Sequence, residues 1–304
     1  MKSLLRLLFV KKKEKNKKIK IKKIAVTRDC FRLGDQMMAA FFTQLLNDNG
    51  FEAVYHIRNG HKNNVQFAHL LDVPVGADGE QFKFSYHAES LPFEINDKNF
   101  MDTAIKKFKE WSGYKGDLKI KTNYVPVKFK VDDSIAPYDV VIVSTCGAFA
   151  QGTKSWPHFA ELKKMLDRQK ISYMDLGEMP FDWTNNPELL HKINNWLYKC
   201  KVFIGLDTGA THYATGILAK KQKKEANFVL QSGFSTFNHW ALQYGDLFTP
   251  IQVEVECRPC VLPYPTEKYS IPSGLNLLDH CPNNHKCMRA LRPETVFELV
   301  VKHI

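Results

Sequence analysis

Residues 202–219 (VFIGLDTGATHYATGILA) combine anion-binding residue types with the elements that would position them. An apolar run ending at Leu206 predicts a strand, Asp207-Thr208-Gly209 breaks it, and the small residues that follow predict a helix. A helix N-terminus offers unpaired backbone N–H groups and the positive end of the helix dipole. Gly209 lets an anion approach the backbone, and Thr208 adds a hydroxyl donor. The stretch therefore indicates either a phosphate or carboxylate site or a purely structural turn.

Two other positions carry groups that could act beside such a site. Asp35 follows Gly34 where a first strand turns into a helix. Its carboxylate would either cap that helix or face a cleft as a general base. Lys154 lies in the loop 146–155, just before a helix, where its ammonium could face a phosphate or simply be solvated. This loop lacks the GxxxxGK[ST] spacing, so it is not a P-loop.

Four cysteines near the end of the chain have a spacing that could hold a metal. Cys257 and Cys260 form a Cys-x-x-Cys pair, and Cys281 and Cys287 follow. Four thiolates can close a tetrahedral zinc or iron site, but the second pair is not Cys-x-x-Cys. A structural metal, reduced unligated thiols and a disulfide pair therefore remain open. Seven cysteines without a secretion signal predict reduced thiols in a cytosol.

The elements that would position these groups alternate between strand and helix. Such alternation predicts right-handed βαβ units and parallel sheets. Two series, separated by a stretch rich in Lys, Asp and Pro, predict two doubly wound Rossmann-like domains facing an interdomain cleft. The expected strands are 23–28, 51–57, 82–86, 139–144, 171–176, 202–206 and 226–230, and the expected helices are 33–49, 64–71, 98–111, 156–169, 187–198, 210–219 and 293–303. The expected domains are a leader at 1–22, an N-terminal acceptor-side domain at 23–135, and a C-terminal nucleotide-binding domain at 136–304 with a cysteine-rich loop at 257–287.

The positive charge of the chain is concentrated at its start. The 304 residues carry a formal charge of +11, and residues 1–23 hold eleven Lys or Arg against the single acid Glu14. The remainder is therefore nearly neutral, which argues against nucleic-acid binding. The leader has no signal-peptide cleavage site, and its apolar group at 4–10 is too short to span a membrane. It is either a peripheral arm for anionic lipid or a solvated tail.

Four motifs follow one another along residues 24–300. They are Leu33-Gly34-Asp35; Gly147-Ala148 leading to Lys154-Ser155-Trp156-Pro157; Asp207-Thr208-Gly209-x-x-His212; and Cys257-x-x-Cys260, Cys281 and Cys287-Met288 followed by Arg292-Pro293-Glu294-x-Val296. In this order they resemble the bacterial lipopolysaccharide heptosyltransferases of glycosyltransferase family 9, most closely the heptosyltransferase II type. The run 28–32 departs from the small residues usual in that family, and the N-terminal half is short, which leaves the acceptor open.

The resemblance implies a GT-B fold and an inverting transfer of a sugar, with ADP-heptose as the usual donor. The acceptor would be a lipopolysaccharide core or another glycan, and the enzyme would be cytoplasmic or peripheral at the inner face of the plasma membrane. Asp35 would deprotonate the acceptor hydroxyl, and Lys154 with the Thr208-Gly209 helix terminus would hold the diphosphate without a catalytic metal. The further donor positions implied are Thr145, Gly147, Glu178 at the ribose, Asp207 and His212.

The resemblance also bears on the end of the chain. Related autotransporter heptosyltransferases have an iron-binding cysteine finger here, whereas many core heptosyltransferases carry similar cysteines with no established metal. The terminal helix at 293–303 is expected to return to the first domain, as is common in GT-B proteins. Three alternatives stay open: a protein-directed heptosyltransferase with a metal finger, an isomerase or epimerase of nucleotide sugars, and a non-catalytic membrane-associated metal-finger protein.

Overall fold

The computed structural model describes residues 23–27, 33–56, 70–83, 100–121, 126–146, 154–180, 183–221, 226–232, 247–258 and 283–304. The predictions for the leader at 1–22, the helix at 64–69, Gly147, Cys260 and Cys281 lie outside these residues, and so does the side chain of Asp35. The predicted helix does not extend to Leu70 and Leu71, because Leu71 forms a β-bridge with Val127. In the part of the chain that is described, no helix is long and apolar enough to cross a membrane.

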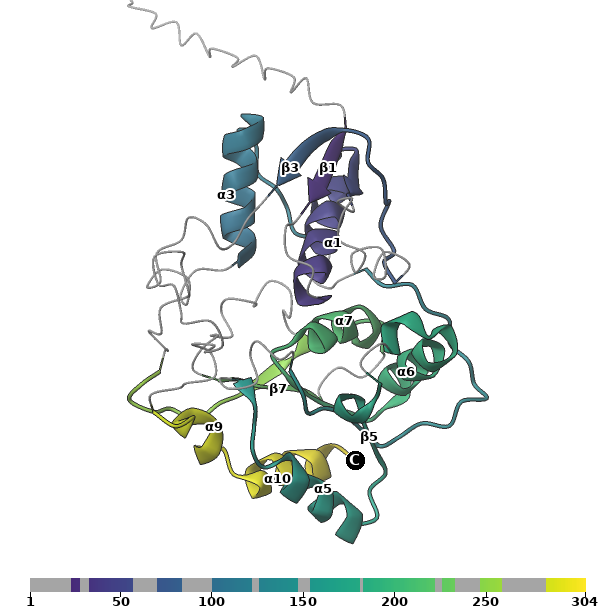
Figure 1. Cartoon of the computed structure of the whole chain (residues 1–304), viewed down its shortest axis with the longest axis vertical. Coiled ribbons are helices and arrows are strands. Elements are labelled where there is room, and N and C mark those ends of the chain that lie inside the picture. Colours follow the sequence, from purple (N-terminus) through teal and green to yellow (C-terminus); the bar gives the residue numbers. More distant parts are fainter. Residues whose placement is uncertain are drawn as a thin grey trace, which may run out of the picture.

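The first half of the chain forms a small parallel sheet with the strand order β2-β1-β3 (Figure 1). Its aromatic core joins Phe42, Phe82 and Phe108, whose ring centroids lie 5.4 to 6.0 Å apart. These rings come from a helix, a strand and a second helix, so they bind all three elements together. The elements are β1 (Ile24–Thr27), α1 (Leu33–Asp48), β2 (Ala53–Tyr55), β3 (Glu80–Lys83) and α3 (Phe100–Ser112).

The second half forms a five-stranded parallel sheet with the order β5-β4-β6-β7-β8. The inner strand VVIV is buried throughout, as expected for a parallel sheet covered on both faces. The strands are β4 (Val140–Val143), β5 (Tyr173–Asp175), β6 (Val202–Leu206), β7 (Asn227–Leu230) and β8 (Thr249–Ile251). The helices are α5 (Phe159–Arg168), α6 (Pro187–Lys199), α7 (Gly209–Leu218), α9 (Lys286–Ala290) and α10 (Pro293–His303), with 3-10 turns η2 (Leu176–Glu178) and η3 (Trp183–Asn185).

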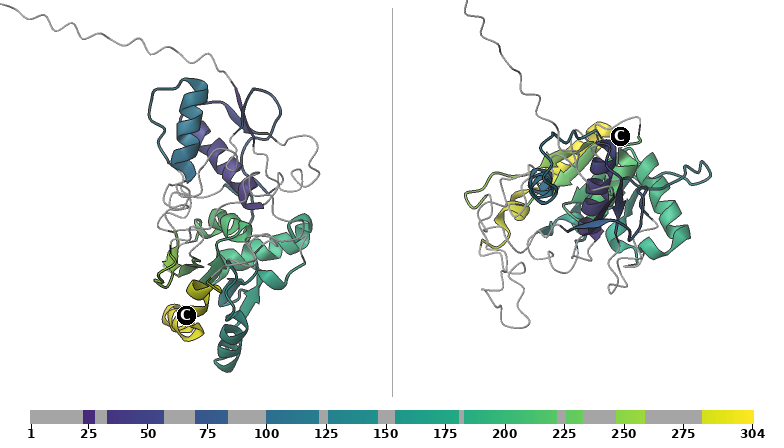
Figure 2. Two further views of the ribbon diagram at one scale, coloured as in Figure 1. Left: turned by 60° about the vertical axis from the view of Figure 1, so that its left-hand side comes forward. Right: turned by 90° about the horizontal axis from the view of Figure 1, so that it is seen from above.

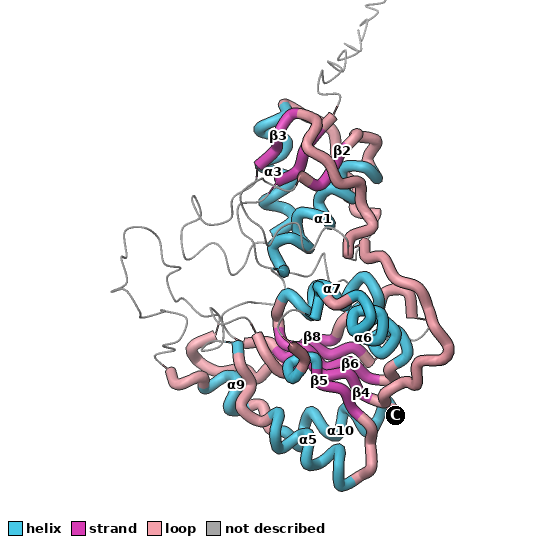
Figure 3. The backbone as a smooth tube through the Cα atoms, turned by 45° about the vertical axis from the view of Figure 1, so that its right-hand side comes forward, coloured by secondary structure: helices cyan, strands magenta, loops and turns pink. Residues whose placement is uncertain are grey.

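Each face of this sheet has its own apolar cluster. Phe203 and Val229 pack with α6 and α7, whereas Ile204 and Leu230 pack with α5 and α10. The helices accordingly lie in layers on either side of the strands (Figures 2 and 3). The edge strand β8 and the short helix α9 were not predicted from the sequence.

The terminal helix α10 corrects one expectation. Its range agrees with the predicted helix, but it does not return to the first sheet. It packs against α5, and Val296 and Val300 share an apolar cluster with Leu162 and Leu166 (Figure 1). The amphipathic stripe of α10 thus covers a face of the second sheet that α5 alone leaves open.

Helices α1 and α7 connect the two halves. Phe41 of α1 and Tyr213 of α7 belong to the same apolar cluster. The helices also approach closely where both begin, because a Cβ atom built on Gly209 would lie 2.7 Å from the backbone N of Gly34. Since α1 follows β1 and α7 follows β6, the carboxyl ends of these strands face one another. The predicted boundary at 135/136 lies between the two sheets and remains a prediction.

Candidate functional site

The strand order of the second sheet indicates where a ligand would bind. The chain starts at β4, adds β5 on one side, and then continues from β6 on the other side. In open parallel sheets, ligands bind beyond the carboxyl ends of the strands at such a switch point. The residues that follow β4 and β6 are therefore the first candidates.

A buried ion pair crosses this switch point. The Nζ atom of Lys154, from the loop after β4, lies 2.7 Å from Oδ2 of Asp207, which directly follows β6. Nζ also donates to the backbone oxygen of Asp207 at 3.1 Å. The two side chains are 15% and 2% exposed, so their charges interact with little screening by solvent. The pair brings together two residues predicted for the donor site.

His212 lies on the other side of the same carboxylate. Its Nε2 is 3.6 Å from Oδ1 of Asp207, and the ring is buried one turn into α7. A Cβ atom on Gly34 would lie 3.3 Å from Cδ2 of His212, so the ring also borders the start of α1. Asp207 thus holds both a lysine and a histidine at the junction of the two halves.

Thr208 is the N-cap residue of α7, yet its side chain does not cap the helix. Its Oγ1 atom is buried and makes no hydrogen bond. A buried hydroxyl without a partner costs about 1–3 kcal/mol, which a ligand atom in the right place would recover. The hydroxyl and the positive end of the α7 dipole therefore offer one site for an oxyanion.

The backbone of Asp35 lies close to this site. Asp35 is the third residue of α1, next to Gly34, which contacts Gly209. It lies within the first helical turn, and both roles of its side chain, as a helix cap and as a general base, stay predictions. The structure thus brings the backbone of the predicted base near the residues predicted to bind the diphosphate.

Thr145 and Glu178 follow β4 and β5 on the other side of the switch point. A Cβ atom on Gly177 would lie 2.9 Å from the backbone N of Thr145, so turn η2 lies against the end of β4. The side chain of Glu178 is 65% exposed, and its Oε1 accepts a hydrogen bond from Nζ of Lys163 at 2.6 Å. Lys163 also pairs with the buried Asp175. Burial opposes the charge on Lys163, but hydrogen bonds to both carboxylates outweigh it and raise its pKa.

Two residues that were not predicted extend the row of polar groups. Gln231 and Ser232 directly follow β7 and are 1% and 2% exposed. The side-chain polar atoms of both residues are buried and make no hydrogen bond. The available signal was the one that identified Asp207, namely polar residues immediately after an apolar strand.

Two of the four cysteines can be placed. Cys257 is half-buried and Cys287, on α9, is buried. A solvent-exposed ion pair between Lys286 and Glu256, each adjacent to one of these cysteines, shows that their segments lie side by side. Within the described ranges no group of three or more His, Cys, Asp or Glu could hold a metal ion, and Cys260 and Cys281 are not among those residues.

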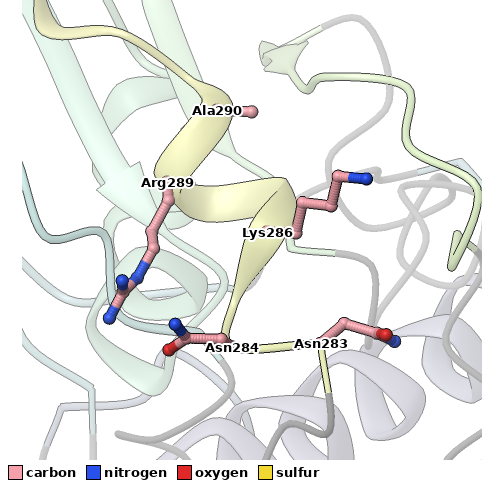
Figure 4. A pocket seen from close by; sticks show the side chains of 5 residues that line it. All are labelled: Asn283, Asn284, Lys286, Arg289 and Ala290. Carbon is pink, nitrogen blue, oxygen red and sulfur yellow. The ribbon is translucent and has the colours of Figure 1, made fainter.

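A hollow of about 380 Å³ lies beside α9 and shares no residue with the site at the switch point. Lys286 and Arg289 give it a basic character (Figure 4). The preceding turn contains Asn284 and His285 in the left-handed backbone region, at φ 46° and 53°. All of its lining residues are exposed to solvent, which makes it a weaker candidate than the buried groups at the switch point.

Comparisons with known proteins identify the fold. No protein-family model matches the chain, and no curated protein sequence matches it either. Among solved structures, it is similar to the iron-containing dodecameric glycosyltransferase TibC from enterotoxigenic E. coli H10407, with a TM-score of 0.59 and 14% identity over 93% of this chain and 76% of that chain. TibC in complex with ADP-D-β-D-heptose gives a TM-score of 0.58, with 13% identity and the same coverage.

The chain has a GT-B fold. The E. coli ADP-heptose lipopolysaccharide heptosyltransferase II is also similar, at a TM-score of 0.48 and 13% identity over 92% of this chain and 99% of that one. These structural neighbours are heptosyltransferases, which are glycosyltransferases. In the GT-B arrangement described above, the candidate residues lie at the carboxyl ends of β4, β5 and β6 in the second sheet.

Proposed function

We propose that this protein is an inverting glycosyltransferase that takes a sugar from a nucleotide-sugar donor, with ADP-heptose as the first choice. The acceptor would be a lipopolysaccharide core or another glycan. One observation carries the proposal: Lys154, Asp207 and Thr208 meet at the switch point of the second sheet, beside the helix start that bears Asp35. TibC, which shares the fold, has been crystallised with ADP-D-β-D-heptose, and this supports the choice of donor.

The diphosphate of the donor would lie at the start of α7. The Thr208 hydroxyl and the positive end of the helix dipole can receive its oxygens. Lys154 would turn its ammonium from Asp207 toward the phosphates, where charge accumulates as the bond to the sugar breaks. Gly209 keeps the helix start free of a side chain. Asp207 would keep its contact with His212.

Asp35 would act as the general base. Its carboxylate takes the proton from the acceptor hydroxyl, whose oxygen attacks the anomeric carbon from the face opposite the diphosphate. The new glycosidic bond forms as the bond between the anomeric carbon and the phosphate oxygen breaks. The diphosphate leaves with the electron pair, and the configuration at carbon inverts. Glu178, Thr145 and Gly147 would border the nucleoside.

The four cysteines would hold a structural iron or zinc ion. Cys257 and Cys287 lie on segments joined by an ion pair, which fits half of a tetrahedral thiolate site. Cys260 and Cys281 would complete it. TibC is described as iron-containing, and this favours a metal over free thiols. The ion would stabilise the loop and would not take part in sugar transfer. Elemental analysis of the purified protein and of a C257S/C287S variant measures this directly.

The activity is tested with a panel of nucleotides and nucleotide sugars. We expect ADP to raise the melting temperature more than UDP or GDP does, and donor hydrolysis, measured by mass spectrometry, to follow the same nucleotide. Asp35→Asn should retain donor binding but lose transfer by about 10² to 10⁴-fold. Absence of any nucleotide response would refute the transferase and favour the metal-finger alternative. Full activity of D35N would refute only the base.

A further inference from the structure

Gln231 is held in place by its backbone and not by its side chain. Its N–H donates to the backbone oxygen of Ile251 at 2.9 Å, and its carbonyl accepts from Nη1 of Arg258 at 3.0 Å. The side-chain amide is buried, with neither Oε1 nor Nε2 hydrogen-bonded. The neighbouring Ser232 hydroxyl is in the same state. Three buried polar side-chain atoms thus have unused hydrogen-bonding capacity.

The register of the sheet places these atoms beside the proposed diphosphate site. Leu206 of β6 is paired with Leu230 of β7, so the next residues along, Asp207 and Gln231, are neighbours at the carboxyl edge. Adjacent parallel strands are about 4.8 Å apart. The polar row from Glu178 after β5 to Gln231 after β7 therefore spans three strand spacings, about 14 Å.

The two ends of this row differ in chemistry. Glu178 lies at the β5 end, Lys154 and Thr208 are in the middle, and an uncharged amide and a hydroxyl lie at the β7 end. A cation and a helix terminus suit a diphosphate. An amide can donate and accept at once, which matches the hydroxyl groups of a sugar better than it matches a phosphate, which offers only acceptors.

The alternation of side chains along β7 also indicates on which face of the sheet Gln231 lies. Val229 packs with α6 and α7, and Gln231, two residues later, is expected on that same face. This face is the one on which α1 meets α7. A sugar beside Gln231 would therefore lie next to the diphosphate site, on the face of the sheet that carries α7 and α1.

We propose that Gln231, together with Ser232, hydrogen-bonds hydroxyl groups of the transferred sugar and thereby selects which nucleotide sugar the site accepts. This inference rests on the proposed glycosyltransferase function and adds the sugar subsite to it. Sites that hydrogen-bond a hydroxyl group discriminate strongly, because an analogue that lacks the hydroxyl leaves buried polar groups unpaired.

The test compares ADP, ADP-heptose and ADP-glucose, measured by calorimetry and turnover on the full chain. Gln231→Leu removes both hydrogen-bonding groups at similar size, Ser232→Ala removes one, and Gln169→Leu at an exposed helix end is the matched control. We expect Q231L to bind ADP within about twofold of wild type, to bind ADP-heptose about 10 to 100-fold more weakly, and to discriminate less between the two sugars. S232A should lose about threefold to tenfold, and the control nothing.

The melting temperature without ligand provides a second readout. If Gln231 is unpaired in the free protein, Q231L should melt at the same temperature as wild type or higher, because an apolar group replaces an unsatisfied amide. Equal loss of ADP and ADP-heptose affinity together with a lower melting temperature would mark Gln231 as structural and overturn the inference. Unchanged ADP-heptose affinity in Q231L and S232A would also overturn it, while the transferase proposal would stand as long as ADP binds. If wild type binds neither ADP nor ADP-heptose, both proposals fail.

Discussion

Removal of Lys154 tests the buried ion pair and the proposed anion site together. Lys154→Met leaves the carboxylate of Asp207, which is 2% exposed, without its partner at 2.7 Å. Breaking a buried pair on one side costs about 3–5 kcal/mol, and His212 at 3.6 Å would compensate in part. We therefore expect a loss near the lower limit, about 3 kcal/mol, or a fall of about 6 to 12 °C in melting temperature.

The comparison uses urea unfolding followed by circular dichroism. Lys201→Met is the matched control, because Lys201 makes an ion pair of similar length, 2.8 Å, with Asp139, but the side chains are 53% and 27% exposed. Such a surface pair contributes about 0–1 kcal/mol. In the K154M/D207N double variant both charges are gone, so most of the stability should return.

Ligand binding separates the structural role of Lys154 from its functional role. ADP should raise the melting temperature of wild type and K201M. The increase should be much smaller for K154M and for the K154M/D207N variant, although K154M/D207N is stable. If the free energy of unfolding of K154M lies within about 1 kcal/mol of the wild-type value, the pair behaves as a solvated pair and the reasoning is refuted. It is equally refuted if the double variant keeps the full response to ADP.

Three further predictions concern other parts of the chain. Gly209→Ala places a methyl group 2.7 Å from the backbone N of Gly34, so it should destabilise the protein by about 1–3 kcal/mol and lower turnover, as measured by unfolding and by steady-state kinetics. Hydrogen bonds from Ser134 and His191 lower the pKa of Asp132. The ionised Asp132 therefore contributes its full stabilisation above about pH 4 and loses it as the pH falls. The melting temperature of Asp132→Asn should accordingly fall less than that of wild type between about pH 5 and pH 3. Cys287→Ser should reduce the bound metal measured by elemental analysis while leaving ADP binding unchanged, and full metal content in this variant would rule out Cys287 as a ligand.

Long apolar strands and amphipathic helices could be predicted from the sequence, because the pattern of apolar and polar residues indicates which positions are buried. The strand at 202–206 and the helix at 293–303 agree with the structure to the residue. The partner of that helix could not be predicted, since an apolar stripe shows that a face is covered but not by what. The edge strand β8 was not predicted, because its three residues include Pro250 and show no alternation of apolar and polar side chains.

The candidate site was predictable where a motif joined a strand to a helix, as at Asp207 and Thr208. Pairings between distant segments could not be read from the sequence. The ion pair between Lys163 of α5 and Glu178 of η2 joins two elements, and no local sequence pattern predicts it. Gln231 was missed for a different reason: its importance lies in the hydrogen bonds it does not make, and only coordinates reveal those.

The glycine contact between α1 and α7 has an electrostatic consequence. Each helix start carries roughly half a positive charge, and near Gly34 and Gly209 the two lie within backbone contact. Like charges at that distance oppose the approach of the two sheets, and the apolar packing of Phe41 and Tyr213 acts against this repulsion. An anionic ligand between the helix starts would reverse the sign of this interaction, so its affinity and the closeness of the two lobes are thermodynamically linked.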